Sequence, residues 1–210
     1  MSTDDQTQVV EWLERLSGLY CREADARDRA IREMRAAGAA RLFPLLRAIL
    51  SDADSCLRLQ ACEAVLWVDP EHGAELVLPL LTDTDANVRY HACGCLHDFG
   101  DERAVGPLAR VLAHDPDPAL RGIAAYALGG IGSPAAIPDL LDVMASDHEF
   151  DNLGHQPSTT AATALDAILA AERQRGYTER TAEEGAEEPD LARLREAALA
   201  AYDAWWARQR

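Results

Sequence analysis

The sequence predicts an all-α fold, a right-handed α-solenoid of about five stacked helix pairs with a capping helix at each end. One observation is an internal repeat: Val88-Arg89 matches Leu120-Arg121 after 32 residues, and Leu57-Arg58 lies 31 residues before Val88-Arg89. A second is the helical spacing of the apolar positions inside each copy. A third is an Asp-x-Asp turn ahead of each copy, a frequent start of a helix. Helix pairs that repeat in this way bury their apolar faces against the next pair, which is how a solenoid is built.

The same pattern places the repeats and their flanks. The predicted repeat domain covers residues 1–176, and an amphipathic helix over residues 3–19 caps its first repeat. Residues 177–189 are charged and poor in apolar side chains, which predicts an acidic flexible linker. Residues 190–210 are predicted to form an amphipathic helix that caps the last repeat or binds another chain. The five repeats fall roughly at 25–50, 52–81, 83–113, 115–145 and 155–175.

An aspartate, an arginine and a proline recur at equivalent positions in the central repeats. The aspartate that ends each Asp-x-Asp turn is predicted to cap the first helix. An arginine four residues later is interpreted as its partner in an Arg–Asp ladder that joins the stack. A proline is expected in the first turn of the second helix, where its missing N–H costs little. In chain order these positions are Asp54, Arg58 and Pro79, then Asp85, Arg89 and Pro107, then Asp117, Arg121 and Pro138.

The regular spacing breaks after the fourth repeat. About five extra residues fall within the segment SDHEFDNLGHQPS at residues 146–158. The repeat pattern then resumes at Thr160. Insertions between repeats are frequent places for function, so this segment is a candidate part of a site.

Composition limits the classes of partner. The net charge is −16, and all 20 basic residues are arginine. Such a charge repels phosphate backbones, so we expect no nucleic acid and favour a basic protein partner. No apolar run reaches the roughly 20 residues that a membrane span needs. The acidic N-terminal segment lacks the basic region of a secretory signal, so we expect no membrane association and a cytoplasmic location.

The repeat resembles HEAT repeats, specifically the short bacterial type first recognised in phycobilin lyase subunits. The matching signature is Asp-x-Asp-x-x-Val/Leu-Arg-x-x-Ala-Ala-x-Ala-Leu-Gly-x-Ile-Gly, followed by a second helix that opens Ala-x-Pro-x-Leu. Residues 115–141 fit it nearly throughout, residues 83–112 fit with His97 in place of the usual glycine, and residues 52–81 fit its first half. The resemblance covers roughly residues 25–170 and implies a fold more than a function.

The resemblance also implies which residues face the concave side of the stack. In this repeat type, first-helix positions beside the Val-Arg pair and between the alanines face that side. Asn87, His91, Gly94 and Asp98 are spaced four, three and four residues apart, which is one face of a helix. Ser55, Gly122 and Gln156 belong to the implied face as well. The candidate partner- or ligand-binding residues are Gln60, Glu63, Trp67, Asn87, Tyr90, His91, Asp98, Tyr126 and His155.

Three functions fit this face. Its tyrosines and tryptophan favour a bacterial protein-interaction module that binds a partner through the concave side. One alternative is an immunity or antitoxin-like protein whose acidic surface neutralises a basic toxin. Another is a small enzyme or small-molecule binder with a hollow lined by Tyr90, His91, Tyr126 and His155.

No catalytic residue, metal ligand or cofactor is predicted. The five cysteines include no CxxC pair, and no HExxH motif occurs. Helical-repeat di-iron hydroxylases that act on a lysine-derived residue carry His-Glu pairs early in their repeats. The comparable positions here hold Tyr90-His91 and Gly122-Ile123, which argues against that activity.

Overall fold

The structure, a computed structural model, describes residues 3–16, 24–147, 149–151, 153–179 and 200. Within these residues every regular element is helical, which confirms the predicted all-α class. The chain divides into two compact units, residues 1–99 and 100–210, each described by itself. The first unit holds α1 (Thr3–Leu16), α2 (Ala24–Ala37), α3 (Ala39–Ile49), α4 (Ser55–Val68), α5 (Pro70–Val77), the 3-10 helix η1 (Leu78–Thr82) and α6 (Ala86–Phe99). The second holds α7 (Glu102–His114), α8 (Pro118–Ile131), the 3-10 helix η2 (Pro134–Ala136), α9 (Ile137–Ser146) and α10 (Pro157–Glu179).

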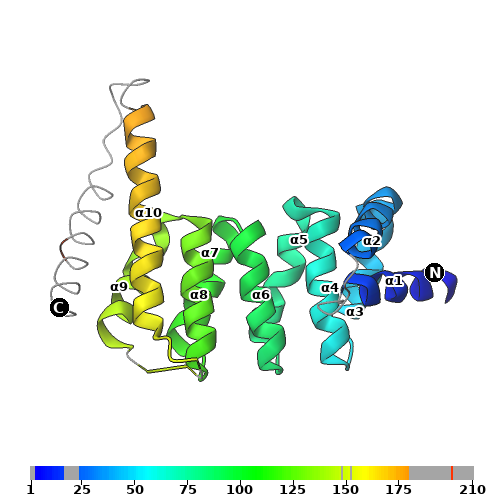
Figure 1. The fold of residues 1–210 in the computed structure, drawn as a ribbon, viewed down its shortest axis with the longest axis horizontal. Helices are drawn as coiled ribbons and strands as arrows, with labels where there is room; N and C mark the ends of the chain where they lie inside the picture. Colours follow the sequence, from blue (N-terminus) through cyan, green and yellow to red (C-terminus); the bar gives the residue numbers. More distant parts are fainter. Residues whose placement is uncertain (1–2, 17–23, 148, 152, 180–199, 201–210) are drawn as a thin grey trace. The chain divides into compact units, whose positions relative to one another are not determined.

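Helix α4 is the centre of the first unit. It contacts α1, α2, α3, α5 and α6, and Figure 1 shows α4 and α6 side by side. The small side chains of Ala61, Cys62 and Ala64 are fully buried, so neighbouring helices approach α4 closely. Val9 and Leu13 of α1 are buried as well, and the Trp12 Nε1–H donates to the Glu33 carboxylate of α2 at 2.8 Å. Helix α1 therefore covers the first helix pair, in the way the sequence predicts for a capping helix.

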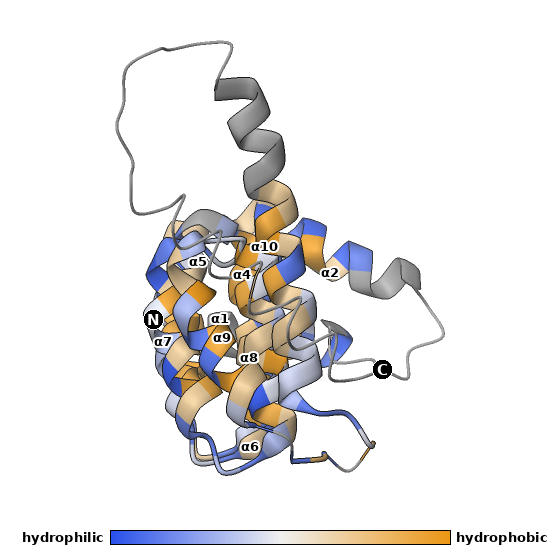
Figure 2. Ribbon diagram, turned by 90° about the vertical axis from the view of Figure 1, so that its left-hand side faces the viewer, coloured by the Kyte–Doolittle hydropathy of each residue, from blue (hydrophilic) through white to orange (hydrophobic). Residues whose placement is uncertain are grey.

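Helix α8 has the corresponding place in the second unit. It contacts α7 and α10, and Figure 2 shows it coloured mostly as hydrophobic along its length. Leu120, Ala124 and Leu128 are buried at helical spacing. At Gly129 the approach to α10 is so close that an added Cβ would lie 2.8 Å from the Ala164 Cβ. A side chain at Gly129 would therefore push α8 and α10 apart.

The Asp-x-Asp turns cap the first helices as predicted. The carboxylate of Asp54 accepts from the Cys56 N–H at 2.8 Å, and that of Asp117 accepts from the Ala119 N–H at 2.9 Å. Asp85 accepts from the Asn87 N–H at 2.8 Å. These bonds satisfy N–H groups that a helix start leaves without a partner inside the helix.

The predicted Arg–Asp ladder forms, but with other partners. Arg58 pairs with Asp83, and Arg121 pairs with Asp147. Each of these aspartates opens the next turn along the chain, whereas the aspartate four residues before the arginine is occupied as a helix cap. The arginines also close their own turns: Arg58, Arg89 and Arg121 each donate from Nη1 to the backbone oxygen six residues earlier.

The second helices depart from the proline prediction. Pro138 is in the first turn of α9 as expected. Pro107 instead lies inside α7, because Asp101 caps that helix and starts it before the proline. Pro79 is the second residue of η1, which follows the short α5. The equivalent prolines thus occupy three different places in their second helices.

The C-terminal predictions fall mostly on residues that the structure does not describe. Residues 157–179, which include the predicted fifth repeat from Pro157 onward, form the single helix α10 in contact with α8 and α9. Apart from residues 177–179 and 200, the predicted linker at 177–189 and the predicted helix at 190–210 lie outside the described residues. In the described part of the chain, no helix is both long and apolar enough to cross a membrane.

Candidate functional site

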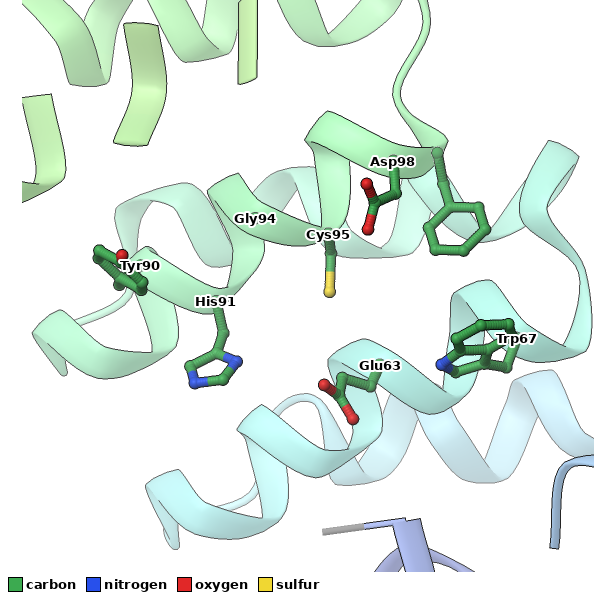
Figure 3. A pocket seen from close by; sticks show the side chains of 8 residues that line it. Glu63, Trp67, Tyr90, His91, Gly94, Cys95 and Asp98 are labelled. Carbon is green, nitrogen blue, oxygen red and sulfur yellow. The ribbon is translucent and has the colours of Figure 1, made fainter. Parts of the chain in front are cut away.

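A hollow of about 260 Å³ opens between α4 and α6. It is lined from α4 by Glu63 and Trp67. Figure 3 shows His91, Cys95 and Asp98 reaching from α6 toward the space that these two side chains border. The full lining is Glu63, Trp67, Tyr90, His91, Gly94, Cys95, Asp98 and Phe99.

Helix periodicity explains why these side chains meet. On α4, Glu63 and Trp67 are four residues apart, and on α6, His91, Gly94 and Asp98 follow at three and four residues. On the opposite faces of these helices, Ala61 and Val65 of α4 and Leu96 of α6 are fully buried in the core. Burial of one face of each helix therefore turns the other face toward the hollow.

Aromatic rings stand at both ends of the hollow. The rings of Trp67 and Phe99 meet edge to face, with centroids 5.6 Å apart and planes at 71°. Tyr90 and the His91 imidazole have centroids 6.3 Å apart. Tyr90 is 44% exposed, so its ring is available to a molecule at the surface.

Two carboxylates give the hollow its charge. Asp98 pairs with the Nδ1 of its neighbour His97 at 2.8 Å, and its side chain is 64% exposed. Among the described residues, no hydrogen bond or ion pair engages the Glu63 carboxylate. No arginine belongs to the lining. The hollow therefore presents the Glu63 carboxylate, which has no partner among the described residues, beside aromatic rings.

Gly94 and Cys95 shape the middle of the hollow. A Cβ built on Gly94 would meet nothing within 4 Å, so the absence of a side chain there leaves open space. The Cys95 thiol forms a hydrogen bond with the Cys62 thiol, and this bond, together with the burial of Cys62, raises the pKa of Cys62 well above its ordinary value. Cys62 is consequently a protonated, structural thiol beneath the hollow.

The other candidate residues lie elsewhere. Gln60 of α4 is half-buried, and its Oε1 is buried without a hydrogen-bond partner among the described residues. Asn87 belongs to the capping turn of α6, where its N–H binds Asp85. Ser55 donates to the same Asp85 carboxylate, which is the main reason that the pKa of Asp85 is lowered. Tyr126, in α8 of the second unit, is 49% exposed.

His155 lines a separate hollow of about 260 Å³ in the inserted segment of the second unit. Asp151 organises this segment, because its Oδ1 accepts from the N–H groups of Leu153 and His155, both at 2.8 Å. Phe150 and Leu153 stand out from it, 66% and 81% exposed. The hollow is lined by Phe150, Gly154, His155, Gln156, Thr159, Thr160 and Thr163.

Two lining residues of the α4–α6 hollow are missing from the candidates predicted by sequence, Cys95 and Phe99. His91, Cys95 and Phe99 follow one another at intervals of four residues, so helical spacing could have indicated both. Cysteine and phenylalanine at that spacing are equally typical of a buried core, which is why the pattern alone does not single them out.

The donor set does not fit a metal centre. Within the described ranges, no three His, Cys, Asp or Glu side chains converge in a way that could hold a metal ion. The single His-Glu pair of the sequence, residues 148 and 149, includes a histidine outside the described residues. The described residues therefore offer no site for the iron pair of the helical-repeat hydroxylases.

Residues 74–153 match the family of HEAT repeats. A deoxyhypusine hydroxylase from Eremothecium gossypii is 30% identical over 135 residues. That match covers 63% of this chain but spans only 38% of the hydroxylase.

Two of the solved structures that are similar to the chain show the degree of likeness. One is an engineered protein of the Northeast Structural Genomics Consortium, at 19% identity over 97% of this chain and 98% of that one, with a TM-score of 0.46. Another is a designed armadillo repeat protein in complex with a (KR)4 peptide, at 14% identity over 91% and 98% of the two chains, also with a TM-score of 0.46. TM-scores at this level indicate only a loose similarity, so no property of either structure is attributed to this chain.

Proposed function

We propose that this chain is a protein-binding module whose partner docks on the face formed by α4 and α6. The observation that carries the proposal is the hollow between these helices. It brings together five of the candidate residues, Glu63, Trp67, Tyr90, His91 and Asp98, from two successive repeats. Tryptophan and tyrosine are the side chains that most often dominate the binding energy of protein interfaces.

The charge of the chain supports a basic partner. A net charge of −16 speeds the encounter with a positively charged protein and slows it with another acidic one. The two carboxylates of the hollow, with no arginine in its lining, place negative charge at the docking face itself. The predicted cytoplasmic location and bacterial origin stay predictions.

The size of the hollow favours a protein side chain over a whole small molecule. Pockets that enclose drug-sized ligands usually measure roughly 300–1,000 Å³. The hollow, at about 260 Å³, is smaller than that and open to the surface at Tyr90. A binding face that accepts single side chains of a larger partner fits these dimensions better than an enclosed ligand or enzyme site.

The test compares two variants at the hollow with one control. Tyr90→Ala and Gly94→Leu should lose the partner that the wild-type chain captures from its source cells. Gly106→Leu is the matched control, because Gly106 is also a helical glycine with nothing within 4 Å of an added Cβ, and it lies on α7. It should retain the partner.

Two further measurements decide the outcome. Thermal melts should show Tyr90→Ala within about 0.5 kcal/mol of the wild type, as for surface truncations. With the captured partner purified, the association rate should fall as salt rises past roughly 0.15 M, where the Debye length is about 8 Å. Equal capture by all variants would contradict the proposal, and a rate that ignores salt would contradict the acidic docking face.

A further inference from the structure

We infer that the hollow between α4 and α6 is a pocket for one arginine side chain of the partner. Its guanidinium group would lie against the Trp67 ring and pair with the Glu63 carboxylate. This inference rests on the proposed protein-binding function and specifies the chemistry that the docking face recognises.

The first argument is the state of Glu63. Its carboxylate borders the hollow and is engaged by no hydrogen bond or ion pair among the described residues. A carboxylate beside low-polarity surfaces gains more from a fixed cation than one in open water does. Asp98, which pairs with His97, adds a second carboxylate from α6. A cationic group that entered the hollow would thus meet carboxylates from both helices.

The second argument is the aromatic wall. Trp67 lines the hollow, and the edge-to-face contact with Phe99 fixes its ring. Tryptophan is the aromatic side chain that attracts cations most strongly over its face. Because Glu63 and Trp67 are one helical turn apart on α4, a single group can touch both.

The shape of the cation decides between arginine and lysine. A guanidinium group is planar, stacks on aromatic rings and offers a fork of N–H donors that matches a carboxylate. The ammonium group of lysine is compact and strongly hydrated, so it would lose more hydration in a hollow lined by rings. The combination of one ring and one unpaired carboxylate therefore favours arginine.

The experiment uses the full chain and three blocked amino acids as probes. N-acetyl-arginine methylamide is titrated at millimolar concentration while amide and indole N–H signals are followed by NMR. We expect saturable shifts at Glu63, Trp67 and Gly94. N-acetyl-citrulline methylamide, which has a similar shape without the charge, should produce none, and the lysine probe should bind more weakly.

Variants test the named contacts. Glu63→Gln and Trp67→Leu should each weaken binding of the arginine probe, Glu63→Gln by about tenfold or more, as expected for a bond between charged groups. Gly94→Leu should abolish binding by filling the hollow, and Gly106→Leu should leave it unchanged. The dispersion of the NMR spectrum shows in each case that the variant is folded.

The possible outcomes separate this inference from the proposed function. Absent arginine shifts, or equal shifts with the citrulline probe, would overturn the arginine pocket. If Tyr90→Ala and Gly94→Leu lose the captured partner while Glu63→Gln retains it fully, the docking face stands and the arginine pocket fails. If every variant retains the partner, the proposed function fails. A positive arginine titration would then identify an arginine pocket that takes no part in binding the partner.

Discussion

Arg58 and Asp83 are joined by two parallel hydrogen bonds, Nε to Oδ2 at 2.7 Å and Nη2 to Oδ1 at 2.6 Å, across 25 residues of chain. Their side chains are only 11% and 8% exposed. Arg58 also donates to the Asp52 carbonyl of its own turn, and Asp83 Oδ1 accepts the Asp85 N–H of the next turn. One ion pair thereby links the turns that precede α4 and α6. The guanidinium group is the main reason that the pKa of Asp83 is lowered.

The ion pair predicts a pH-dependent loss of stability. Because the pKa of Asp83 is lower in the folded chain than its unfolded value of about 3.9, ionised Asp83 stabilises the fold fully above that value. This contribution is lost as pH falls through the lowered folded pKa. Asp83→Asn should therefore lower the melting temperature by a few degrees near neutral pH, and the gap to the wild type should narrow in strong acid.

Glu11→Gln is the control for this measurement. Glu11 and Arg15 form an exposed pair at 3.9 Å on a single helix, α1. Such pairs contribute roughly 0–1 kcal/mol, so the melting temperature should change little at either pH. If the difference in melting temperature between Asp83→Asn and the wild type stays constant down to strong acid, the ionised carboxylate is not the stabilising species.

Gly129 predicts a steric effect between α8 and α10. A Cβ at this position would lie 2.8 Å from the Ala164 Cβ and 2.9 Å from its Cα, both atoms that cannot move without the helix. Gly129→Ala should cost about 1–3 kcal/mol of unfolding free energy, as overpacked cores do. Gly106→Ala meets nothing within 4 Å and should gain roughly 0.5–1 kcal/mol from helix propensity. Denaturant titrations that rank the two variants equally would contradict the close approach.

The hydrogen bonds to Asp151 lead us to expect that its carboxylate orders the inserted segment. Its carboxylate binds the N–H groups of Leu153 and His155, and the bond from the His155 N–H is the main cause of its lowered pKa. Asp151→Ala should speed hydrogen exchange at these two amides and leave α9 and α10 unchanged. Asp166→Ala, on an exposed position of α10, is the control. Unchanged exchange at residue 155 would mean that the segment is held by other contacts.

The cysteines predict an order of reactivity. Cys56 is exposed, whereas Cys62 is buried and has a raised pKa, so little of its reactive thiolate forms near neutral pH. Alkylation of the native chain, followed by mass spectrometry, should modify Cys56 first and Cys62 only as the unit opens. In denaturant the two rates should become similar. Comparable rates in the native chain would show that Cys62 is accessible.

The first helices could be predicted from sequence because their signals are local. Asp54, Asp85 and Asp117 cap the first helices α4, α6 and α8 where the repeat spacing places them. The partners of the arginines could not be predicted, since Arg58 and Asp83 are 25 residues apart and are brought together by the arrangement of α4, α5 and η1. Pro107 does not mark the start of its helix, because Asp101 caps α7 and the helix begins five residues before the proline.

The candidate site was partly predictable for the same reason. Helix periodicity alone groups His91, Gly94 and Asp98 on one face, and the repeat offset adds Glu63 and Trp67. Periodicity cannot say which residues of that face border open space. Asn87 shares the face of α6, yet it belongs to the capping turn, which depends on how the chain enters the helix.

The ion pairs Arg58–Asp83 and Arg121–Asp147 enclose chain segments that differ in secondary structure. Between Arg58 and Asp83 the chain forms α5 and the 3-10 helix η1, whereas between Arg121 and Asp147, one residue farther apart, it forms η2 and then α9. The same Arg–Asp pairing therefore joins successive turns although the segments enclosed differ in secondary structure. A segment enclosed by such a pair can therefore differ in its helices while the ion pair that joins the two turns is kept. Repeats of unequal length could accumulate in such a chain without a redesign of each boundary.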